Sequence, residues 1–167
     1  MNKFLKFLKI RRSIRSFKNK SISKGKLEQI CDAARFAVTA RNLQPWEFVA
    51  VTDQEKLNRL AELAENGRFL AQAAACIAVF SIDTKYFLED ASAATCNILL
   101  AATALGIGSC WIAGDKKPYC PQVSVLLNAP AGMKLVSLVA LGYPLEKNAF
   151  KIVPKKELKA MLHWESF

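Results

Sequence analysis

The chain has 167 residues, of which 52% are hydrophobic and 23% are charged. This length and composition exclude an intrinsically disordered chain and predict one globular domain with its own core, spanning residues 1–167. The net charge of +10 predicts a negatively charged partner, but it does not choose among a nucleic acid, an anionic membrane surface and a small anion.

The N-terminal half of the chain alternates between helical and extended patterns. Apolar residues recur at helical spacing in two segments, and the stretch "EFVAVT" is β-branched and alternates in polarity. "TDQE" at 52–55 fits a capping box that opens a further helix ending near Asn66-Gly67. The elements predicted here are helices over 2–10, 24–40 and from 52–55 to 66–67, and a strand over 47–52.

The C-terminal half contains the most apolar segments. "ACIAVFSI" at 75–82 is a continuous apolar run of strand length, which predicts a strand buried on both faces. The helix predicted over 88–105 is apolar nearly all round, so we expect a partner subunit to cover it. Strands are predicted over 109–112 and 134–144, and short helices over 121–127 and 155–162. The mixed order of helices and strands predicts an α+β fold with a sheet between helices.

Five cysteines occur without a C-x-x-C pair, which predicts neither a disulfide framework nor a zinc site. Free buried thiols are typical of a reducing compartment, so we expect a cytoplasmic protein. The N-terminal segment is too interrupted by lysine for a signal peptide, and no apolar run predicts a transmembrane helix.

Side chains able to carry out catalysis by themselves are scarce. His163 is the only histidine, so neither a nucleophilic triad nor a transition-metal site is predicted, and we expect no metal. "GIGSC" at 106–110 lacks the third glycine of a dinucleotide-binding fingerprint and lies at the end of a predicted helix. An enzyme with this sequence is therefore expected to take its reactive group from a cofactor.

The basic residues form two clusters. Ten lysines and arginines occur in the first 26 residues without any acid, and a second group lies within 147–159. Within "IRRSIRSF" at 10–17, guanidinium groups surround Ser13, and guanidinium groups bind phosphate bidentately. If the two ends of the chain meet, they form one anion pocket. The alternative that composition favours is a solvated basic face.

A second polar segment, "ARNLQPWEF" at 40–48, follows a predicted helix and precedes a strand. The amides of Asn42 and Gln44 can both donate to and accept from the edge of a heterocycle. The alternative is a polar loop closed by aromatic residues.

Taken together, these segments resemble the nitroreductase family of FMN-dependent oxidoreductases. The resemblance covers residues 8–165 and rests on four motifs in order: "RRSIRSF", "NLQPWEF", "DASAATCNILLAATALGIGSCWI" at 90–112, and "LVALGYP" with the closing "PKKELKAMLHWE". It implies a three-layer α-β-α sandwich around a mainly antiparallel sheet. It also implies an intertwined homodimer with two FMN sites at the interface.

The resemblance also implies roles for individual residues. Arg11, Arg12 and Ser13 would hold the phosphate and ribityl chain of FMN, with Lys155 and Lys156 closing on the phosphate. Arg15 would reach the edge of the flavin ring and is the expected catalytic residue. The partner's flavin would be contacted by Val38, Thr39, Ala40, Asn42 and Gln44, and the ring would lie near Ile112, Ala113 and Gly114. NADH or NADPH would donate the hydride.

The chain departs from the family pattern at a few positions. Ala40 lacks a hydroxyl common in the family, and Cys96 stands where glutamine is common. Only "DTKYFLE" separates the strand over 75–82 from the next helix, where larger relatives carry a helical excursion, so we expect an open substrate site. Nitroaromatics, quinones, flavins and enones all fit such a site as electron acceptors.

Three other functions remain open at this level. A flavin-binding dimer without turnover would have the same fold, and so would an enzyme for reductive dehalogenation or flavin breakdown. A nucleic-acid-binding module fits the charge, but aromatic residues do not interleave with the basic ones as in known single-strand binders, so we expect no nucleic-acid or membrane partner.

Overall fold

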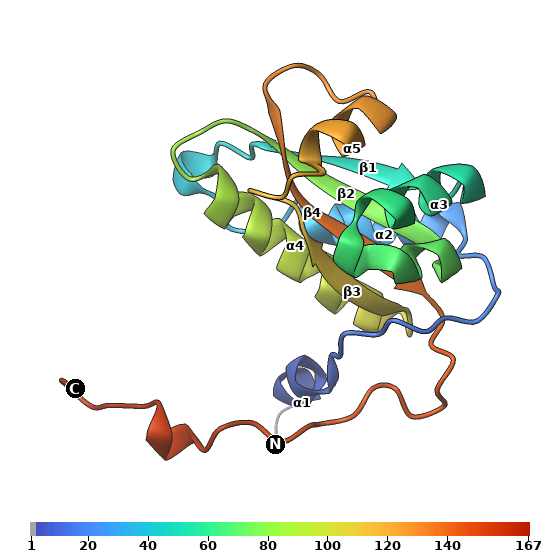
Figure 1. Cartoon of the computed structure of the whole chain (residues 1–167). Helices are drawn as coiled ribbons and strands as arrows, with labels where there is room; N and C mark the ends of the chain where they lie inside the picture. The colour runs from blue at the N-terminus through green and yellow to red at the C-terminus, as the bar shows by residue number, and fades with distance from the viewer. Residues whose placement is uncertain (1–2) are drawn as a thin grey trace.

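The computed structural model describes residues 3–167 and contains five α-helices and four β-strands in this part of the chain. Their order mixes the two types throughout (Figure 1). The α-helices are α1 (Lys3–Ile10), α2 (Lys24–Ala34), α3 (Gln54–Leu63), α4 (Phe87–Ala104) and α5 (Cys120–Leu126). The strands are β1 (Trp46–Val51), β2 (Ala75–Ile82), β3 (Gly108–Ala113) and β4 (Met133–Gly142). Short 3₁₀ turns span Ala40–Asn42, Glu65–Gln72 and Leu158–Ala160.

The four strands form one antiparallel sheet in the order β1-β2-β4-β3. The two central strands are the predicted apolar runs, and the continuous run of β2 is buried from Ala75 to Ser81. Strand β3 lies at an edge, where Cys110 pairs with Ala140 of β4. The α+β fold and the antiparallel sheet are therefore confirmed.

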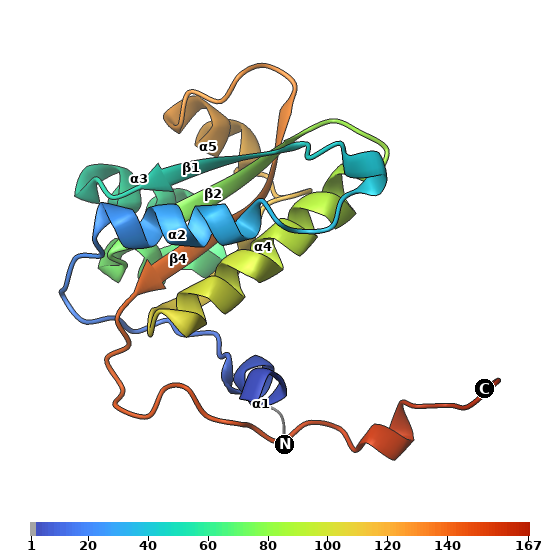
Figure 2. The same cartoon turned by 180° about the vertical axis from the view of Figure 1, so that it is seen from behind.

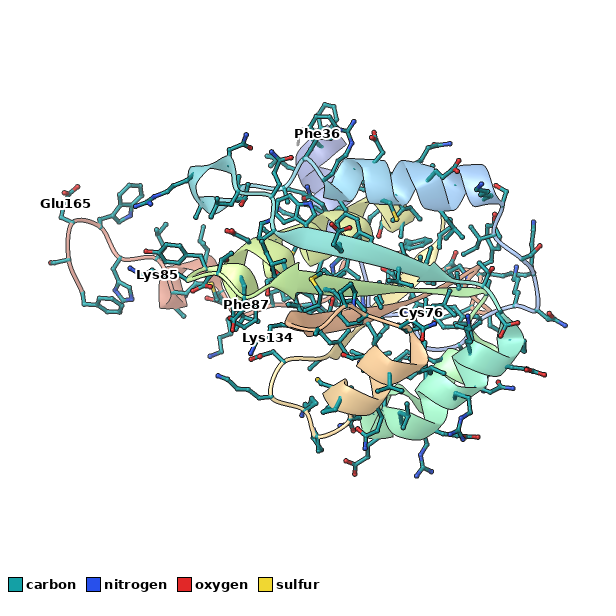
Figure 3. The ribbon with its side chains drawn as sticks, turned by 90° about the horizontal axis from the view of Figure 1, so that it is seen from above. Phe36, Cys76, Lys85, Phe87, Lys134 and Glu165 are labelled. Carbon is teal, nitrogen blue, oxygen red and sulfur yellow. The ribbon has the colours of Figure 1, made fainter. Side chains whose placement is uncertain are left out.

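Helices cover both faces of the sheet, which gives three layers (Figures 2 and 3). Alternate side chains of β2 point to opposite sides, as the twofold period of a strand requires. Ala78 and Phe80 pack into one core with α3 and α5, whereas Ile77 and Val79 pack into a second core with α2 and α4. The sandwich expected from the family resemblance is thus present within a single chain.

Predicted helix boundaries were wrong at the end of α2 and at both ends of α3, which ends at Leu63 rather than near Asn66-Gly67. Helix α2 ends at Ala34 rather than at residue 40, because the chain turns into an irregular loop in which Val38 is 81% exposed. The N-cap of α3 is Asp53, whose side chain accepts a hydrogen bond from the amide of Lys56 at 2.9 Å, so the cap lies one residue after Thr52.

The last predicted helix, over 155–162, is reduced to the 3₁₀ turn at Leu158–Ala160. Residues 155–167 are exposed throughout, so they bury little apolar surface. A short helix gains most of its stability from tertiary packing, so this segment lacks what would stabilise it.

Helix α1 and the arm that follows β4 both lie below the sandwich (Figures 1 and 2). After Pro144 the chain leaves the sheet as an extended arm that passes α1 and runs away from the domain (Figures 1 and 2). Apolar side chains remain exposed on both ends: Phe4, Leu5, Leu8, Ile152, Leu158, Met161, Leu162, Trp164 and Phe167. Exposed apolar residues in such numbers are typical of an interaction surface.

Among residues 3–167, no helix has the length and the hydropathy that a membrane crossing requires.

Candidate functional site

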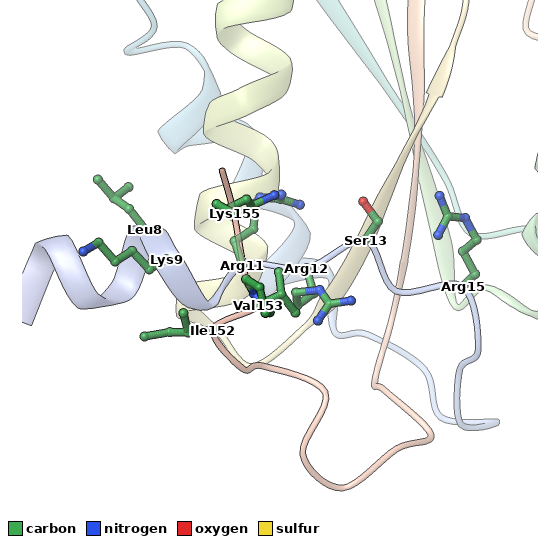
Figure 4. Close-up of a pocket in the computed structure, with 10 residues that line it drawn as sticks. Leu8, Lys9, Arg11, Arg12, Ser13, Arg15, Ile152, Val153 and Lys155 are labelled. Carbon is green, nitrogen blue, oxygen red and sulfur yellow. The ribbon is translucent and has the colours of Figure 1, made fainter. Parts of the chain in front are cut away.

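A cavity of about 980 Å³ lies where the segment after α1 meets the C-terminal arm (Figure 4). Its cationic side chains come from both ends of the sequence: Lys9, Arg11, Arg12, Arg15 and Lys155. Ser13, also in the lining, contributes a hydroxyl, and Leu8, Ile152, Val153 and Pro154 contribute apolar surface. The two basic ends therefore form one pocket, as the charge clusters suggested. This volume lies in the range typical of small-molecule sites.

Most of the positive charge in this cavity has no acidic partner among the described residues. No acidic residue lines it, and within the described part of the chain Arg11, Arg12 and Lys155 form no ion pair. Convergent guanidinium and ammonium groups repel one another, so the arrangement favours an anionic ligand. A guanidinium fork beside a hydroxyl is a donor set that suits a phosphate group.

The arginine segment is held against the edge strand of the sheet. Ser13 forms a bridge to Ser109 of β3, and Phe17 forms another to Pro144, directly after β4. Gly142 leaves room for the Phe17 ring, since a Cβ there would lie 2.6 Å from ring carbons. These contacts place Arg11, Arg12 and Arg15 beside β3 although about a hundred residues separate them in sequence.

A smaller hollow of about 160 Å³ adjoins the first along β3. Arg15 lines both, and its guanidinium carbon lies 5.8 Å from the centre of the Phe69 ring. The other lining residues are Asn66, Cys110, Trp111, Ile112, Ala113, Lys117 and Tyr119. Arg15 thus stands between a cationic cavity and a more closed hollow that contains an amide, a lysine and aromatic rings.

The backbone at the end of β3 is fixed by side chains of the next helix. The Tyr119 hydroxyl donates to the carbonyl of Ala113, and the Cys120 thiol donates to the carbonyl of Gly114 at 2.9 Å. Burial raises the pKa of the Tyr119 phenol, so it remains a hydrogen-bond donor at neutral pH. Gly114 itself cannot carry a side chain, because a Cβ would lie 2.7 Å from the carbonyl oxygen of Leu135.

Cys110 lies under the arginine segment. Burial raises the pKa of its thiol, against the opposing influence of Arg15, a hydrogen bond from Ser13 and the charge of Arg11. The thiol is therefore protonated at neutral pH and acts as a packed side chain rather than as a nucleophile. All five cysteines are free.

The loop that contains the remaining predicted residues is far from the cavity in the same chain. Residues 38–44 contact Asp90 in the first turn of α4, whereas the arginine segment joins β3 just after the last turn of α4. The 18 residues of α4 span roughly 27 Å. One chain alone cannot bring the two parts together.

The predicted site residues thus fall into four groups. Five line the main cavity: Arg11, Arg12, Ser13, Arg15 and Lys155. Ile112 and Ala113 line the adjoining hollow, with Gly114 directly after them, and Lys156 is exposed on the arm outside the cavity lining. Val38, Thr39, Ala40, Asn42 and Gln44 lie at the opposite end of α4.

Sequence reasoning missed Asn66, Phe69, Lys117 and Tyr119 as site residues. Asn66 and Phe69 lie in the irregular segment after α3, and Lys117 and Tyr119 lie in the turn between β3 and α5. The Asn66-Gly67 pair was interpreted only as a helix end. No local sequence pattern predicts a site at these four positions, because they come close to Arg15 only in the folded chain.

An antiparallel sheet between two helical layers, with a cationic cavity along one edge strand, places the protein in the class of nitroreductase-like α+β folds. The sequence pattern of the family described as "Nitroreductase family" matches residues 8–75 and 64–143. The chain belongs to the nitroreductase family, whose members are flavin-dependent oxidoreductases.

Individual relatives agree with this assignment. A protein of Archaeoglobus fulgidus, provisionally named NADH dehydrogenase/NAD(P)H nitroreductase, is 39% identical over 157 residues, which cover 90% of each chain. An FMN-dependent nitroreductase of Clostridium difficile has a TM-score of 0.88 and 31% identity, with 98% of this chain and 99% of that one covered. A provisionally named nitroreductase of Desulfovibrio desulfuricans, solved in complex with FMN, has a TM-score of 0.82 and 28% identity, covering 100% and 99%.

Proposed function

We propose that the protein is an FMN-dependent oxidoreductase that uses NADH or NADPH to reduce a small organic acceptor such as a nitroaromatic, a quinone, a flavin or an enone. The observation that carries the proposal is that Arg11, Arg12, Arg15 and Lys155 line one cavity, with no acidic residue among its described lining residues. Family membership and the FMN complex of a relative support the same cofactor.

The donor set of the cavity fits the phosphate of FMN. Arg11, Arg12 and Lys155 supply positive charge, and the exposed Ser13 hydroxyl supplies a further donor. Arg15 lines both this cavity and the hollow that contains Ile112 and Ala113. FMN has a phosphate at one end and a planar ring at the other. The phosphate would fit the cationic cavity, and the ring would fit the partly aromatic hollow beside it.

When bound, FMN supplies the transfer of a hydride from NADH or NADPH to the acceptor. The role of Arg15 is to hold a positive charge beside the edge of the ring, where negative charge develops during reduction. Asn66 is an additional candidate donor or acceptor for the edge of the ring. The hydrogen bonds from Tyr119 and Cys120 keep the backbone at Ala113 and Gly114 in place beside it.

The working unit in this proposal is a homodimer. The loop at 38–44 lies a helix length away from the cavity of its own chain, so it completes the site of a second chain. The exposed apolar side chains of α1 and the C-terminal arm, together with the outer face of α4 around Cys96, provide the surface for that contact. Free cysteines suit a reducing cytoplasm.

The substrate site in this proposal is open. Residues 83–86 alone connect β2 to α4, so this connection contains no additional helix that could cover the site. An open site admits several small planar acceptors in turn, which fits a mechanism in which donor and acceptor use the same place successively.

The first test is the visible absorption spectrum of the purified protein, followed by release of the chromophore with heat and its identification. We expect FMN at about one per chain and its bleaching by NADH or NADPH. A matched pair of variants sharpens the test: Arg11→Gln should lose FMN, and Arg59→Gln, which removes an exposed guanidinium on α3, should retain it. A colourless protein that takes up no added FMN would overturn the proposal.

A further inference from the structure

The carboxylate of Asp90 holds the loop at 38–44 by two hydrogen bonds. Its Oδ2 accepts from the hydroxyl of Thr39 at 2.9 Å, and its Oδ1 accepts from the backbone amide of Ala40 at 3.0 Å. Asp90 is 5% exposed in the first turn of α4. The positive end of the helix dipole favours its negative charge there.

A third hydrogen bond links this contact to the other end of the loop. The Thr39 hydroxyl, which donates to Asp90, accepts from the backbone amide of Gln44 at 3.2 Å. One buried carboxylate therefore fixes the beginning of the loop directly and its end through Thr39. Pro45 follows the loop directly before β1, and the carbonyl of Pro45 accepts a hydrogen bond from the amide of Ile82 at 3.0 Å.

The loop needs such support because its backbone is strained. Arg41 and Gln44 have φ angles of 53° and 49°, in the left-handed region that such residues rarely adopt, and Asn42, a residue type that tolerates this region, has a φ of 56°. Their side chains, and that of Leu43, are exposed and do not anchor the loop in the core. Strained backbone persists only where its surroundings hold it, and Asp90 is the buried group that does so here.

We propose that Asp90 is the positioning residue that sets the loop at 38–44 against the flavin ring of the partner subunit. This inference rests on the proposed function, in which the loop completes the second chain's FMN site. Asp90 touches neither cofactor nor substrate. It acts through Thr39, Ala40 and Gln44, and it should affect the surroundings of the ring rather than retention of the phosphate.

The test compares Asp90→Ala with the conservative Asp90→Asn, and Glu89→Ala serves as the control on an exposed side chain of the same helical turn. In the FMN-free protein, amide hydrogen exchange at Ala40 and Gln44 should accelerate on the order of tenfold or more in Asp90→Ala. With FMN bound, the visible circular dichroism of the flavin should change, and kcat should fall on the order of tenfold while FMN content is kept.

Asp90→Asn keeps an acceptor for Ala40 and a polar contact to Thr39, so its amide exchange rates and its flavin dichroism should both lie close to those of the wild type. Because Asp90→Ala removes a buried group, Thr39→Val provides a second variant that deletes only the linking hydroxyl and should change exchange at Gln44 and the flavin dichroism in the same direction. Wild-type protein that binds FMN, with exchange and dichroism unchanged in Asp90→Ala and Thr39→Val, would overturn this inference alone. Wild-type protein that takes up no FMN would overturn the proposed function, and this inference with it.

Discussion

The backbone amide of Ile14 donates a hydrogen bond to the carbonyl of Ser109 at 2.9 Å. This contact joins the arginine segment to the edge strand β3, and Gly108 makes it sterically accessible. A Cβ at Gly108 would lie 2.9 Å from Cβ and Cγ2 of Ile14. The position of all three arginines therefore depends on a missing side chain in the strand beside them.

Gly108→Ala is expected to displace the arginine segment from β3. Overpacking of this kind costs about 1–3 kcal/mol of unfolding free energy, and we expect a clear loss of FMN affinity with it. Denaturant unfolding and fluorescence titration with FMN measure the two effects. Gly25→Ala is the control, since a Cβ there has no neighbour within 4 Å. Equal FMN affinity in both variants would contradict the proposed dependence.

Arg11→Ala should weaken FMN retention. Loss of a hydrogen bond to a charged group costs about 1.5–3 kcal/mol, or roughly ten- to a hundredfold in affinity. Flavin content after extended dialysis measures the effect. The difference from wild type should diminish as ionic strength rises, because salt screens interactions between exposed charges. Unchanged flavin content would remove Arg11 from the phosphate site.

Arg15→Ala should slow reduction more than it weakens FMN binding. Arg15 lies between the cationic cavity and the hollow at Ile112, so its charge acts near the proposed ring rather than at the phosphate alone. Loss of an electrostatic stabiliser typically lowers the rate by about a hundredfold or more. Stopped-flow reduction by NADH or NADPH measures the rate. Reduction of Arg15→Ala at the wild-type rate would contradict the proposed role of Arg15.

Cys96→Glu should prevent dimer formation and, with it, FMN binding. Cys96 is exposed on the outer face of α4 in a single chain, so a charge there leaves the fold of that chain intact. In a symmetric contact along α4, the new carboxylate would be buried near its own copy. Size-exclusion chromatography with light scattering measures the mass. Val125→Glu, at a residue 77% exposed on α5, is the control and should stay dimeric with FMN bound.

The unfolding free energy should decrease as the pH rises above about 9. Burial raises the pKa of the Cys76 thiol from 9.0 to about 12. Between these values the folded chain keeps a proton that the unfolded chain releases, so this stabilisation is complete below pH 9 and is lost as the pH approaches 12. The slope amounts to about 1.4 kcal/mol per pH unit. Denaturant titrations of wild type and Cys76→Ala should therefore converge with rising pH, and parallel pH profiles would contradict the prediction.

Much of the architecture was predictable from local patterns. The apolar run at 75–82 corresponds to β2 residue for residue, and the predicted strands at 47–52, 109–112 and 134–144 differ from the observed ones by one or two residues at their ends. These segments combine β-branched residues with apolar runs, and strand burial follows directly from that composition. Helix ends were less predictable, because the apolar spacing of α2 continues past Ala34, where the helix ends.

Apart from the family resemblance, which pointed to Ile112, Ala113 and Gly114, the candidate site could be predicted only where a residue's chemistry is unusual by itself. Three arginines around Ser13 predict an anion site, although a solvated basic face fits the same pattern, and the amides at 42 and 44 predict a polar loop. Nothing local indicates that Asn66 and Phe69 lie beside Arg15, or that Asp90 fixes Thr39 and Ala40. Those relationships join positions far apart in sequence.

The sequence by itself therefore determined the fold class and predicted the charge of the ligand and the segment expected to bind it, because periodicity and side-chain chemistry are local properties. The tertiary structure alone decided that Arg11 and Lys155 share one cavity, that Arg15 also lines the hollow at β3, and that the loop at 38–44 is a helix length away from both. The physical reason is that sheet register and helix length set distances between residues, and neither is contained in any short stretch of the chain.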